Sequence, residues 1–347
     1  MSSNINTTPL QDSQNEKWII DTDPGIDDSF AIILGMTVLK ENLIALSIGN
    51  GNVGIDGCFI NAKKICAIKD CHIPIYKGCY PNLSGVNFEA SDFHGKDGLL
   101  NLDEFEGYEK KYKENIMKEL KNQKNPLIDR FSPLKIIELS YKHSKNLSIL
   151  AIGPLTNLAA AIMLDPSLPQ RINRVVIMGG SYTSLGNIKS NVEFNFACDP
   201  IAAKKVFDSF HNEHNDIIVY PWETCQEHKI LREHLTLIGK FESTTKNYCE
   251  KIINKKIHYP GDGIFADFGS AVYMANKNCV KKSLRKYVDI SIDSNDSNFG
   301  QIFMEQDYSY NRSKSGNLIG DKRKKVEILT NLDKDMYYEC FMRMNEL

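Results

Sequence analysis

Short apolar runs alternate with amphipathic segments along most of the chain. The runs are typical of buried strands and cover residues 18–20, 43–48, 74–77, 147–152, 174–178 and 217–220. Segments with apolar residues at helical spacing follow most of them, at 26–34, 56–69, 134–142, 236–256 and 265–273. Strands that alternate with helices favour a parallel sheet. We therefore expect an α/β protein with a single doubly wound, mostly parallel open sheet flanked by helices.

The two ends of the chain depart from this alternation. Residues 1–16 are polar and lack the apolar core of a signal peptide, which predicts a disordered tail before one folded domain over 17–347. Further strands are expected at 287–292 and 326–329, with a last helix from Asp333. Residues 192–196 alternate apolar and polar side chains, which predicts an extended segment.

Composition excludes several classes of protein. The chain is 42% hydrophobic and 25% charged, as globular proteins are, and its net charge of -2 offers no basic field for nucleic acid. No apolar run approaches the roughly 18 residues of a membrane helix. Nine cysteines without a C-x-x-C pair fit reduced, buried thiols. We expect a cytoplasmic protein that binds neither nucleic acid nor membrane.

Four acids crowd the first strand–helix junction: Asp21, Asp23, Asp27 and Asp28. Carboxylates this close repel one another unless a cation joins them. The helix N-terminus contributes only about 0.3–1 kcal/mol per charge, too little to hold four. Their oxygen ligands suit Ca²⁺ or Mg²⁺ better than zinc. A simple helix cap by two of these acids would leave the other two unexplained.

Other polar positions also follow predicted strands or open helices. Asn52 lies in the loop after the second strand, where ligands bind in open α/β sheets, whereas we interpret Asn50 as a turn residue with positive φ. His94 lies in a Gly-rich loop and faces either a ligand or solvent. Asp267, alone among small and apolar residues, is either a metal ligand or a helix N-cap.

Together these motifs resemble the nucleoside hydrolases of the inosine–uridine preferring family. Residues 21–28 match that family's D-x-D-P-G-x-D-D pattern, and further motifs follow in the family's order at 51–52, 94–98, 153–157, 178–180, 186–187, 193–195 and 199–200. The resemblance runs from Trp18 to the end of the chain. It implies the nucleoside hydrolase fold and hydrolysis of the N-glycosidic bond of purine or pyrimidine ribonucleosides to free base and ribose. A homodimer or homotetramer is also implied.

The resemblance further implies a Ca²⁺ site and a set of site residues. The implied ligands are Asp21, Asp23, Asp28, Asp267 and the backbone carbonyl of Ile152. Asp23 would be the general base for a water that the ion holds and acidifies. The implied substrate contacts are Asp27, Asn52, His94, Met178, Asn187, Glu193 and Asn195. Of these, Asn187, Glu193 and Asn195 would hold the 5′ side of the ribose, with Met178 packing beneath it. If 192–196 is extended, Glu193 and Asn195 also point the same way.

One departure from the family leaves the leaving-group acid open. Many members carry His or Trp before the acid that corresponds to Asp267, and this chain has Ala266. We predict that His258 or Tyr259, just before a Pro-Gly break, supplies the proton, with His94 as the alternative. Residues 221–224 also differ from the family's common pattern, so the base preference stays open.

Two other functions remain as alternatives. Ala266 is compatible with a degenerate protein that binds nucleosides without hydrolysing them. Asp21 and Asp23 after a strand also resemble the Mg²⁺-dependent phosphatases of the haloacid dehalogenase type, although the late acidic motif is misplaced by one residue and the 153–157 and 193–195 motifs have no role there. Release of reducing sugar from a nucleoside, or of phosphate from an ester, separates these possibilities.

Overall fold

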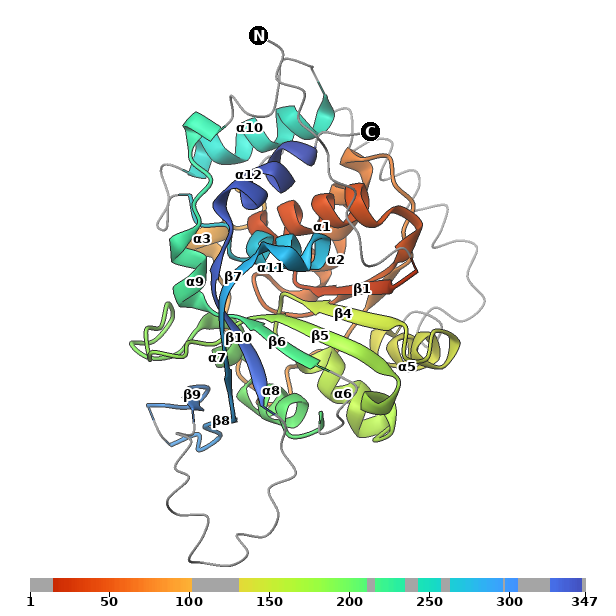
Figure 1. Ribbon diagram of the computed structural model, residues 1–347, viewed down its shortest axis with the longest axis vertical. Coiled ribbons are helices and arrows are strands. Elements are labelled where there is room, and N and C mark those ends of the chain that lie inside the picture. Colours follow the sequence, from red (N-terminus) through yellow and green to blue (C-terminus); the bar gives the residue numbers. More distant parts are fainter. Residues whose placement is uncertain are drawn as a thin grey trace, which may run out of the picture.

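The centre of the molecule is an open sheet with helices on both faces (Figure 1). The computed structural model describes residues 15–101, 131–210, 216–234, 243–256, 263–295, 297–304 and 325–344. Within these ranges the main sheet has eight strands in the order β3-β2-β1-β4-β5-β6-β10-β7. Its strands are β1 (Lys17–Thr22), β2 (Leu43–Ile48), β3 (Ile75–Lys77), β4 (Leu147–Ala151), β5 (Ile172–Met178), β6 (Asp216–Tyr220), β7 (Val280–Lys286) and β10 (Val326–Leu332).

All pairs of neighbouring strands are parallel except β10 and β7. The α-helices that surround the sheet or border the site are α1 (Ile26–Leu39), α2 (Ile55–Ile68), α3 (Ser91–His94), α5 (Ser132–Lys142), α6 (Thr156–Leu164), α7 (Phe194–Cys198), α8 (Pro200–Phe207), α9 (Trp222–Glu227), α10 (Thr244–Lys256), α11 (Ala266–Ala275) and α12 (Lys334–Arg343). A separate hairpin pairs β8 (Val288–Ile290) with β9 (Ile302–Met304). The doubly wound, mostly parallel sheet expected from the sequence is confirmed.

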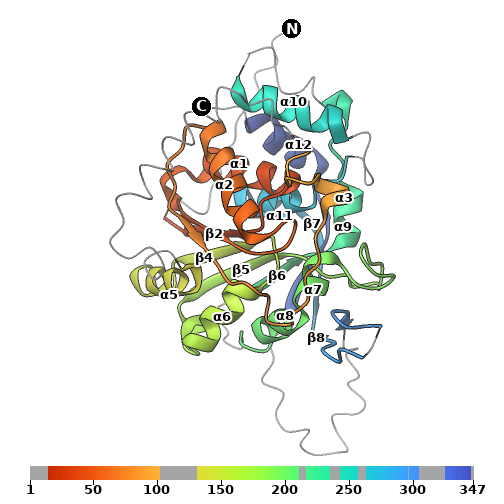
Figure 2. The same cartoon turned by 180° about the vertical axis from the view of Figure 1, so that it is seen from behind.

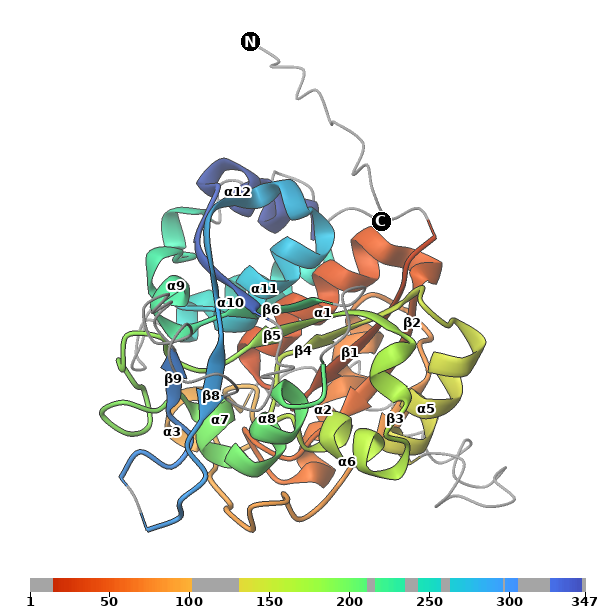
Figure 3. The same ribbon diagram turned by 60° about the horizontal axis from the view of Figure 1, so that its bottom comes forward.

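Two hydrophobic cores lie on the two faces of the sheet. In β1, Trp18 and Ile20 pack into the core shared with α1, α2, α10, α11 and α12, whereas Ile19 packs into the core shared with α5, α6 and α8. Figure 3 brings α5, α6 and α8 forward, on the face opposite α1. A strand buried on both faces needs apolar residues at successive positions, which explains the continuous apolar run of β1.

The strand order reverses between β1 and β4. From β1 the chain winds outward through β2 and β3, and from β4 it winds the other way through β5 and β6 (Figure 2). Adjacent strand ends remain tied together, since Gly49 N–H donates to the Thr22 carbonyl at 2.7 Å and Ile152 N–H donates to the Asp21 carbonyl at 2.8 Å. Open α/β sheets bind ligands in the crevice at such a reversal, outside the carboxyl ends of the strands.

The segment at 192–196 is not extended, and that prediction is wrong. Residues 194–198 form α7, and Glu193 is its N-cap, with a carboxylate that accepts the backbone N–H groups of Asn195 and Phe196. A capping side chain stabilises the first turn of a helix, and this local bond outweighs the alternating pattern. Glu193 and Asn195 therefore do not share one face of a strand.

The structure also decides three smaller points. Asn50 does not have a positive φ; its side-chain oxygen instead accepts the N–H of Ile55 at the start of α2. Asp267 is not an N-cap, because that position belongs to Phe265. The strand β7 was not expected, since its sequence is rich in Lys and Arg. It pairs with β10 only, and charged side chains are common on such edge strands.

Some sequence predictions fall outside the described residues: most of the N-terminal tail, the beginning of the helix expected at 236–256, and the segment 257–262. All nine cysteines are free thiols; seven are buried, and Cys71 and Cys79 are half-buried. In the ranges given above, no helix has the length and apolar character of a membrane span.

Candidate active site

A cavity of about 370 Å³ opens at the carboxyl ends of the central strands. All seven residues that the sequence assigned to substrate binding line it: Asp27, Asn52, His94, Met178, Asn187, Glu193 and Asn195. Ile152 and Asp267, two of the assigned metal ligands, line it as well. The cavity lies within the size range of small-molecule sites. Residues from the beginning, middle and end of the chain thus meet in one place.

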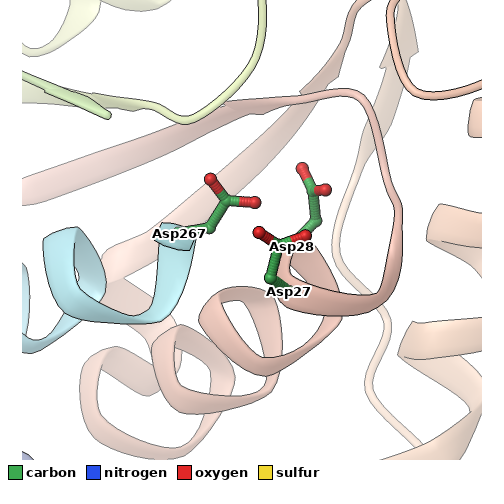
Figure 4. Close-up of side chains that lie close together, drawn as sticks. All are labelled: Asp27, Asp28 and Asp267. Carbon is green, nitrogen blue, oxygen red and sulfur yellow. The ribbon is translucent and has the colours of Figure 1, made fainter. Parts of the chain in front are cut away.

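Three carboxylates meet beside this cavity, and two of them, Asp27 and Asp267, line it. Asp27 and Asp28 come from the first turn of α1, and Asp267 comes from the first turn of α11 (Figure 4). One oxygen from each lies within 4.8 Å of the others, and all three side chains are buried. Two helix N-termini therefore direct their partial positive charge at the cluster. This alone does not balance three buried acids, so the donor set fits a hard divalent cation.

Burial raises the pKa of each acid in this region. The pKa of Asp27 rises to about 7, through burial and then through the charge of Asp28. Burial raises the pKa of Asp267 well above its usual range, and Asp27, Asp28 and Asp23 add to that rise. Without a cation these side chains therefore hold protons that water-exposed carboxylates release. Metal binding here must displace protons.

Asp23 lies between two loops at the strand ends. One carboxylate oxygen, Oδ2, accepts the backbone N–H of Asn52 at 2.7 Å. The other, Oδ1, is buried and has no hydrogen-bond partner within the described ranges. A side chain at Gly51 or Gly153 would clash with this carboxylate, so both glycines are required for its close approach. The free oxygen is available to a ligand.

Asp28 is held by three donors. Its Oδ1 accepts the Thr22 hydroxyl at 2.5 Å, and its Oδ2 accepts the backbone N–H of Gly25 and the side-chain amide of Asn52, each at 2.9 Å. The Asn52 amide nitrogen also donates to the Asp23 carbonyl at 3.0 Å. Asn52 therefore orients two of the acids, and its side-chain oxygen remains for the cavity.

Asp21 is not part of the three-carboxylate cluster and does not line the cavity. Its Oδ1 accepts the hydroxyl of Ser47 and the side-chain amide of Asn157, the latter at 2.9 Å. Its Oδ2 is buried without a partner in the described chain. Burial raises its pKa to about 6, against the effect of the two hydrogen bonds. Its assignment as a metal ligand stays a prediction.

The sequence reasoning gave no role to Ser47 or Asn157, although Asn157 closes the 153–157 motif. The Asn157 side-chain oxygen also accepts the N–H of Cys79, at 2.8 Å. These residues order Asp21 and the loop after β3 from behind the cavity. The sequence feature that could have identified Asn157 is its place in that motif. No sequence feature singles out Ser47, since it lies within an apolar strand.

The side of the cavity formed by α7 is organised by Glu193. Its carboxylate accepts the backbone N–H groups of Gly180 at 2.8 Å, Asn195 at 2.9 Å and Phe196 at 3.2 Å. Burial nevertheless raises its pKa to about 7. The Asn195 amide nitrogen donates to the carbonyls of Ile152 and Met178, both at 3.1 Å. Its side-chain oxygen is left for the cavity.

His94 lines the cavity beside Asp27. Its Nδ1 accepts the N–H of Ile26 at 3.1 Å and lies 3.7 Å from Asp27 Oδ1. Burial lowers the pKa of this histidine to about 3, and the charge of Lys256 adds to the effect. The ring is therefore neutral, and because Nδ1 is an acceptor, Nε2 carries the N–H. Of the two interpretations left open for His94, the one in which it faces a ligand is favoured.

Aromatic and apolar side chains complete this half of the cavity. Phe93, Phe194 and Trp222 line it and are half-buried, and Ala266 lines it beside Asp267. Periodicity did not identify Phe93 or Trp222 as wall residues, because both follow loops. His258 and Tyr259, the predicted leaving-group acids, lie outside the described residues.

The chain is similar to known proteins over most of its length. Residues 18–339 match the model of the inosine-uridine preferring nucleoside hydrolase family. The chain is 35% identical to uridine nucleosidase 1 of Arabidopsis thaliana over 258 residues, which cover 73% of this chain and 70% of that protein. It is 28% identical to the pyrimidine-specific ribonucleoside hydrolase RihB of Escherichia coli O1:K1 / APEC over 56% of this chain and 57% of RihB. A solved plant nucleoside hydrolase, PpNRh1, shares the fold, with a TM-score of 0.78 at 23% identity over 96% of this chain and 99% of that one.

Proposed function

The chain belongs to the inosine-uridine preferring nucleoside hydrolase family and is a ribonucleoside hydrolase, and we propose that it cleaves pyrimidine ribonucleosides, uridine above all, with a bound Ca²⁺. The observation that carries the proposal is the joint placement of the acid cluster and the seven predicted substrate residues in one cavity. Such a site offers a cation position beside a sugar position.

The residues present fit Ca²⁺. The donors are carboxylate and carbonyl oxygens, which suit a hard cation. Buried oxygens of Asp21, Asp23 and Asp27 lack hydrogen-bond partners within the described ranges. We assign the ion to Asp28 and Asp267 of the cluster, to Asp23 and to the Ile152 carbonyl, with Asp21 as a further ligand. Asp27, the third acid of the cluster, then remains for the substrate. When bound, Ca²⁺ would supply positive charge that orders oxygen ligands and makes a water molecule more acidic.

The side chains around that position have separate tasks. Asp23 accepts a proton from the attacking water through its free oxygen, Oδ1. The water oxygen bonds to C1′ of the ribose, and the C1′–N bond breaks with its electron pair moving to the base. Positive charge develops on the sugar, and the surrounding carboxylates and amide oxygens stabilise it. The departing base gains one proton.

The other polar residues position the sugar and base. Asn52 and Asn195 each offer a side-chain oxygen to the cavity, because their amide nitrogens are committed to protein groups. Asn187 offers its amide nitrogen, since its oxygen accepts the N–H of Phe194 at 2.8 Å. Asp27 and His94 lie where the sugar and base halves of the cavity meet.

The preference for pyrimidines rests on two supports. Uridine nucleosidase 1 and RihB are both named for pyrimidine substrates. The wall beside Asp267 carries Ala266, which cannot stack on a purine as a tryptophan would. The source of the base's proton remains a prediction, with His258 or Tyr259 as its donor. The homodimer or homotetramer also remains a prediction.

A nucleoside panel tests the proposal. Purified protein with Ca²⁺ is incubated with uridine, cytidine, inosine and adenosine, and bases are separated by chromatography while reducing sugar is measured. We expect uracil and ribose in equal amounts, with a higher kcat/KM for uridine than for inosine. Binding of uridine without ribose release would instead identify a nucleoside-binding protein, and faster purine turnover would refute the base preference.

A further inference from the structure

A buried lysine stands behind the base-side wall of the cavity. Lys256, the last residue of α10, is 1% exposed. Its ammonium nitrogen lies 3.0 Å from the centre of the Phe93 ring and 3.5 Å from the Phe93 carbonyl oxygen. Among the described lysines and arginines, only Lys256 and Arg171 are buried. Burying an ammonium group is costly, and an apolar side chain of similar length would avoid that cost.

The same region forms a closed ring of contacts between three helices. Tyr248 of α10 donates its hydroxyl to Ser29 of α1 at 2.8 Å. At its other end, α10 contacts α3 through Lys256 and Phe93. α3 returns to the start of α1 through His94, which accepts the Ile26 N–H. Figure 2 shows α3 and α10 on the same side of the molecule.

The charge of Lys256 lies near residues of both the sugar half and the base half of the cavity. Lys256 acts electrostatically on Asp27 and on His94, the two residues where the halves meet. It is not itself a wall residue, whereas Phe93 and His94 are. Cation–π contact and a carbonyl acceptor both fix α3 relative to α10. The contacts of Lys256 therefore couple α10 to the two wall residues of α3, Phe93 and His94.

We propose that Lys256 is a positioning residue for the nucleobase: its ammonium group holds α3 so that Phe93 and His94 meet the base in the orientation that hydrolysis requires. The inference rests on the proposed nucleoside hydrolase function. It assigns Lys256 no contact with the sugar or the ion. Removing its charge should slow the hydrolysis of nucleosides, because their base must be held and protonated as it departs. It should not slow the hydrolysis of a substrate whose leaving group departs without protonation.

The test compares Lys256→Met with Lys256→Arg and with Lys251→Met, a control that removes an exposed lysine from the same helix. Each variant is assayed on uridine and on p-nitrophenyl riboside, whose leaving group needs no protonation. Wild-type turnover of both substrates establishes the proposed function first. For Lys256→Met we expect kcat/KM for uridine to fall about 10- to 100-fold, the scale of a misplaced contact, with the second substrate within about twofold. Lys256→Arg should recover most of the loss because it keeps the charge over the ring.

Two further measurements separate positioning from general damage. Inhibition by free ribose and affinity for Ca²⁺ should both stay at the wild-type value in Lys256→Met. Equal losses on the two substrates, weaker ribose or Ca²⁺ binding, or unchanged uridine kinetics would each overturn the proposal. If Lys256→Met does not fold, Lys256→Gln takes its place and the same outcomes decide.

Discussion

The two halves of the cavity are built in different ways. The acid half comes from strand ends and from the first turns of α1 and α11, and its carboxylates are buried and ordered by backbone N–H groups and amides. The base half comes from α3 and α9, short helices whose aromatic side chains, Phe93 and Trp222, are half-buried. The groups that we propose to perform the reaction are thus held at strand ends and helix starts, whereas the groups that we propose to select the base lie on separately variable elements.

Metal removal should have the largest effect, and it acts on the acid half alone. Chelation should abolish hydrolysis and lower Tm, because the acids lose their counter-charge. The raised pKa values of Asp21, about 6, and Asp27, about 7, mean that the metal-free folded protein binds protons more tightly than the unfolded chain. The contribution of these two acids to the stability of the metal-free protein is therefore greatest at low pH, and it is lost as the pH rises through these values.

The Tm gain on adding Ca²⁺ should consequently be larger at pH 8 than at pH 5. Thermal unfolding with excess Ca²⁺ or with chelator at both pH values measures it. An equal gain at both, or full activity after complete chelation, would show that the cluster is not the metal site.

Asp23→Asn comes next. Loss of the Asp23 carboxylate should lower kcat for uridine by about 10²–10⁴-fold, the usual contribution of a general base. Inhibition by ribose should change less. Asp56→Asn is the matched control, because that side chain is 83% exposed and pairs only with Lys77 on the surface. Near-complete turnover by Asp23→Asn would remove Asp23 from the mechanism.

A substrate without the 5′-hydroxyl tests the edge of the acid half, where we expect the 5′ side of the ribose to lie. Asn187 offers its amide nitrogen and Asn195 its side-chain oxygen, and 5′-deoxyuridine cannot use either. We expect its kcat/KM to be about 10²-fold below that of uridine. Asn187→Ala should slow uridine but leave 5′-deoxyuridine nearly unchanged, since the lost contact is already absent. Equal effects on both substrates would argue against a 5′ contact.

Trp222→Leu should have the smallest effect and concerns the base half. The change widens the wall next to the base, so the ratio of kcat/KM for inosine to that for uridine should change by about tenfold. Ca²⁺ affinity should not change. Tyr141→Leu, at an aromatic residue that is 61% exposed, is the control. A loss of Ca²⁺ affinity in Trp222→Leu would mean that the two halves are not independent.

Most of the acid half could be predicted from the sequence because most of its acids lie close together in the chain. The acids at 21–28 follow a buried strand and open a helix, so their spacing alone places them at one strand end. The order of strands and helices likewise predicted the parallel sheet, because each element is long and periodic. The alternating pattern at 192–196 gave a wrong prediction of an extended segment, since Glu193 caps a helix with its own side chain. Pattern reasoning fails where one side-chain hydrogen bond decides the backbone.

The type of fold, an oxygen-rich site and many of the residues that line the cavity could therefore be predicted from the sequence. That Asp27 lies with Asp28 and Asp267, that Asn157 supports Asp21 and that Lys256 is buried against Phe93 became visible only in the folded chain. These residues are far apart in the sequence or belong to different elements. Strand and helix formation depends on neighbouring residues, whereas a contact between distant side chains exists only once packing brings their elements together.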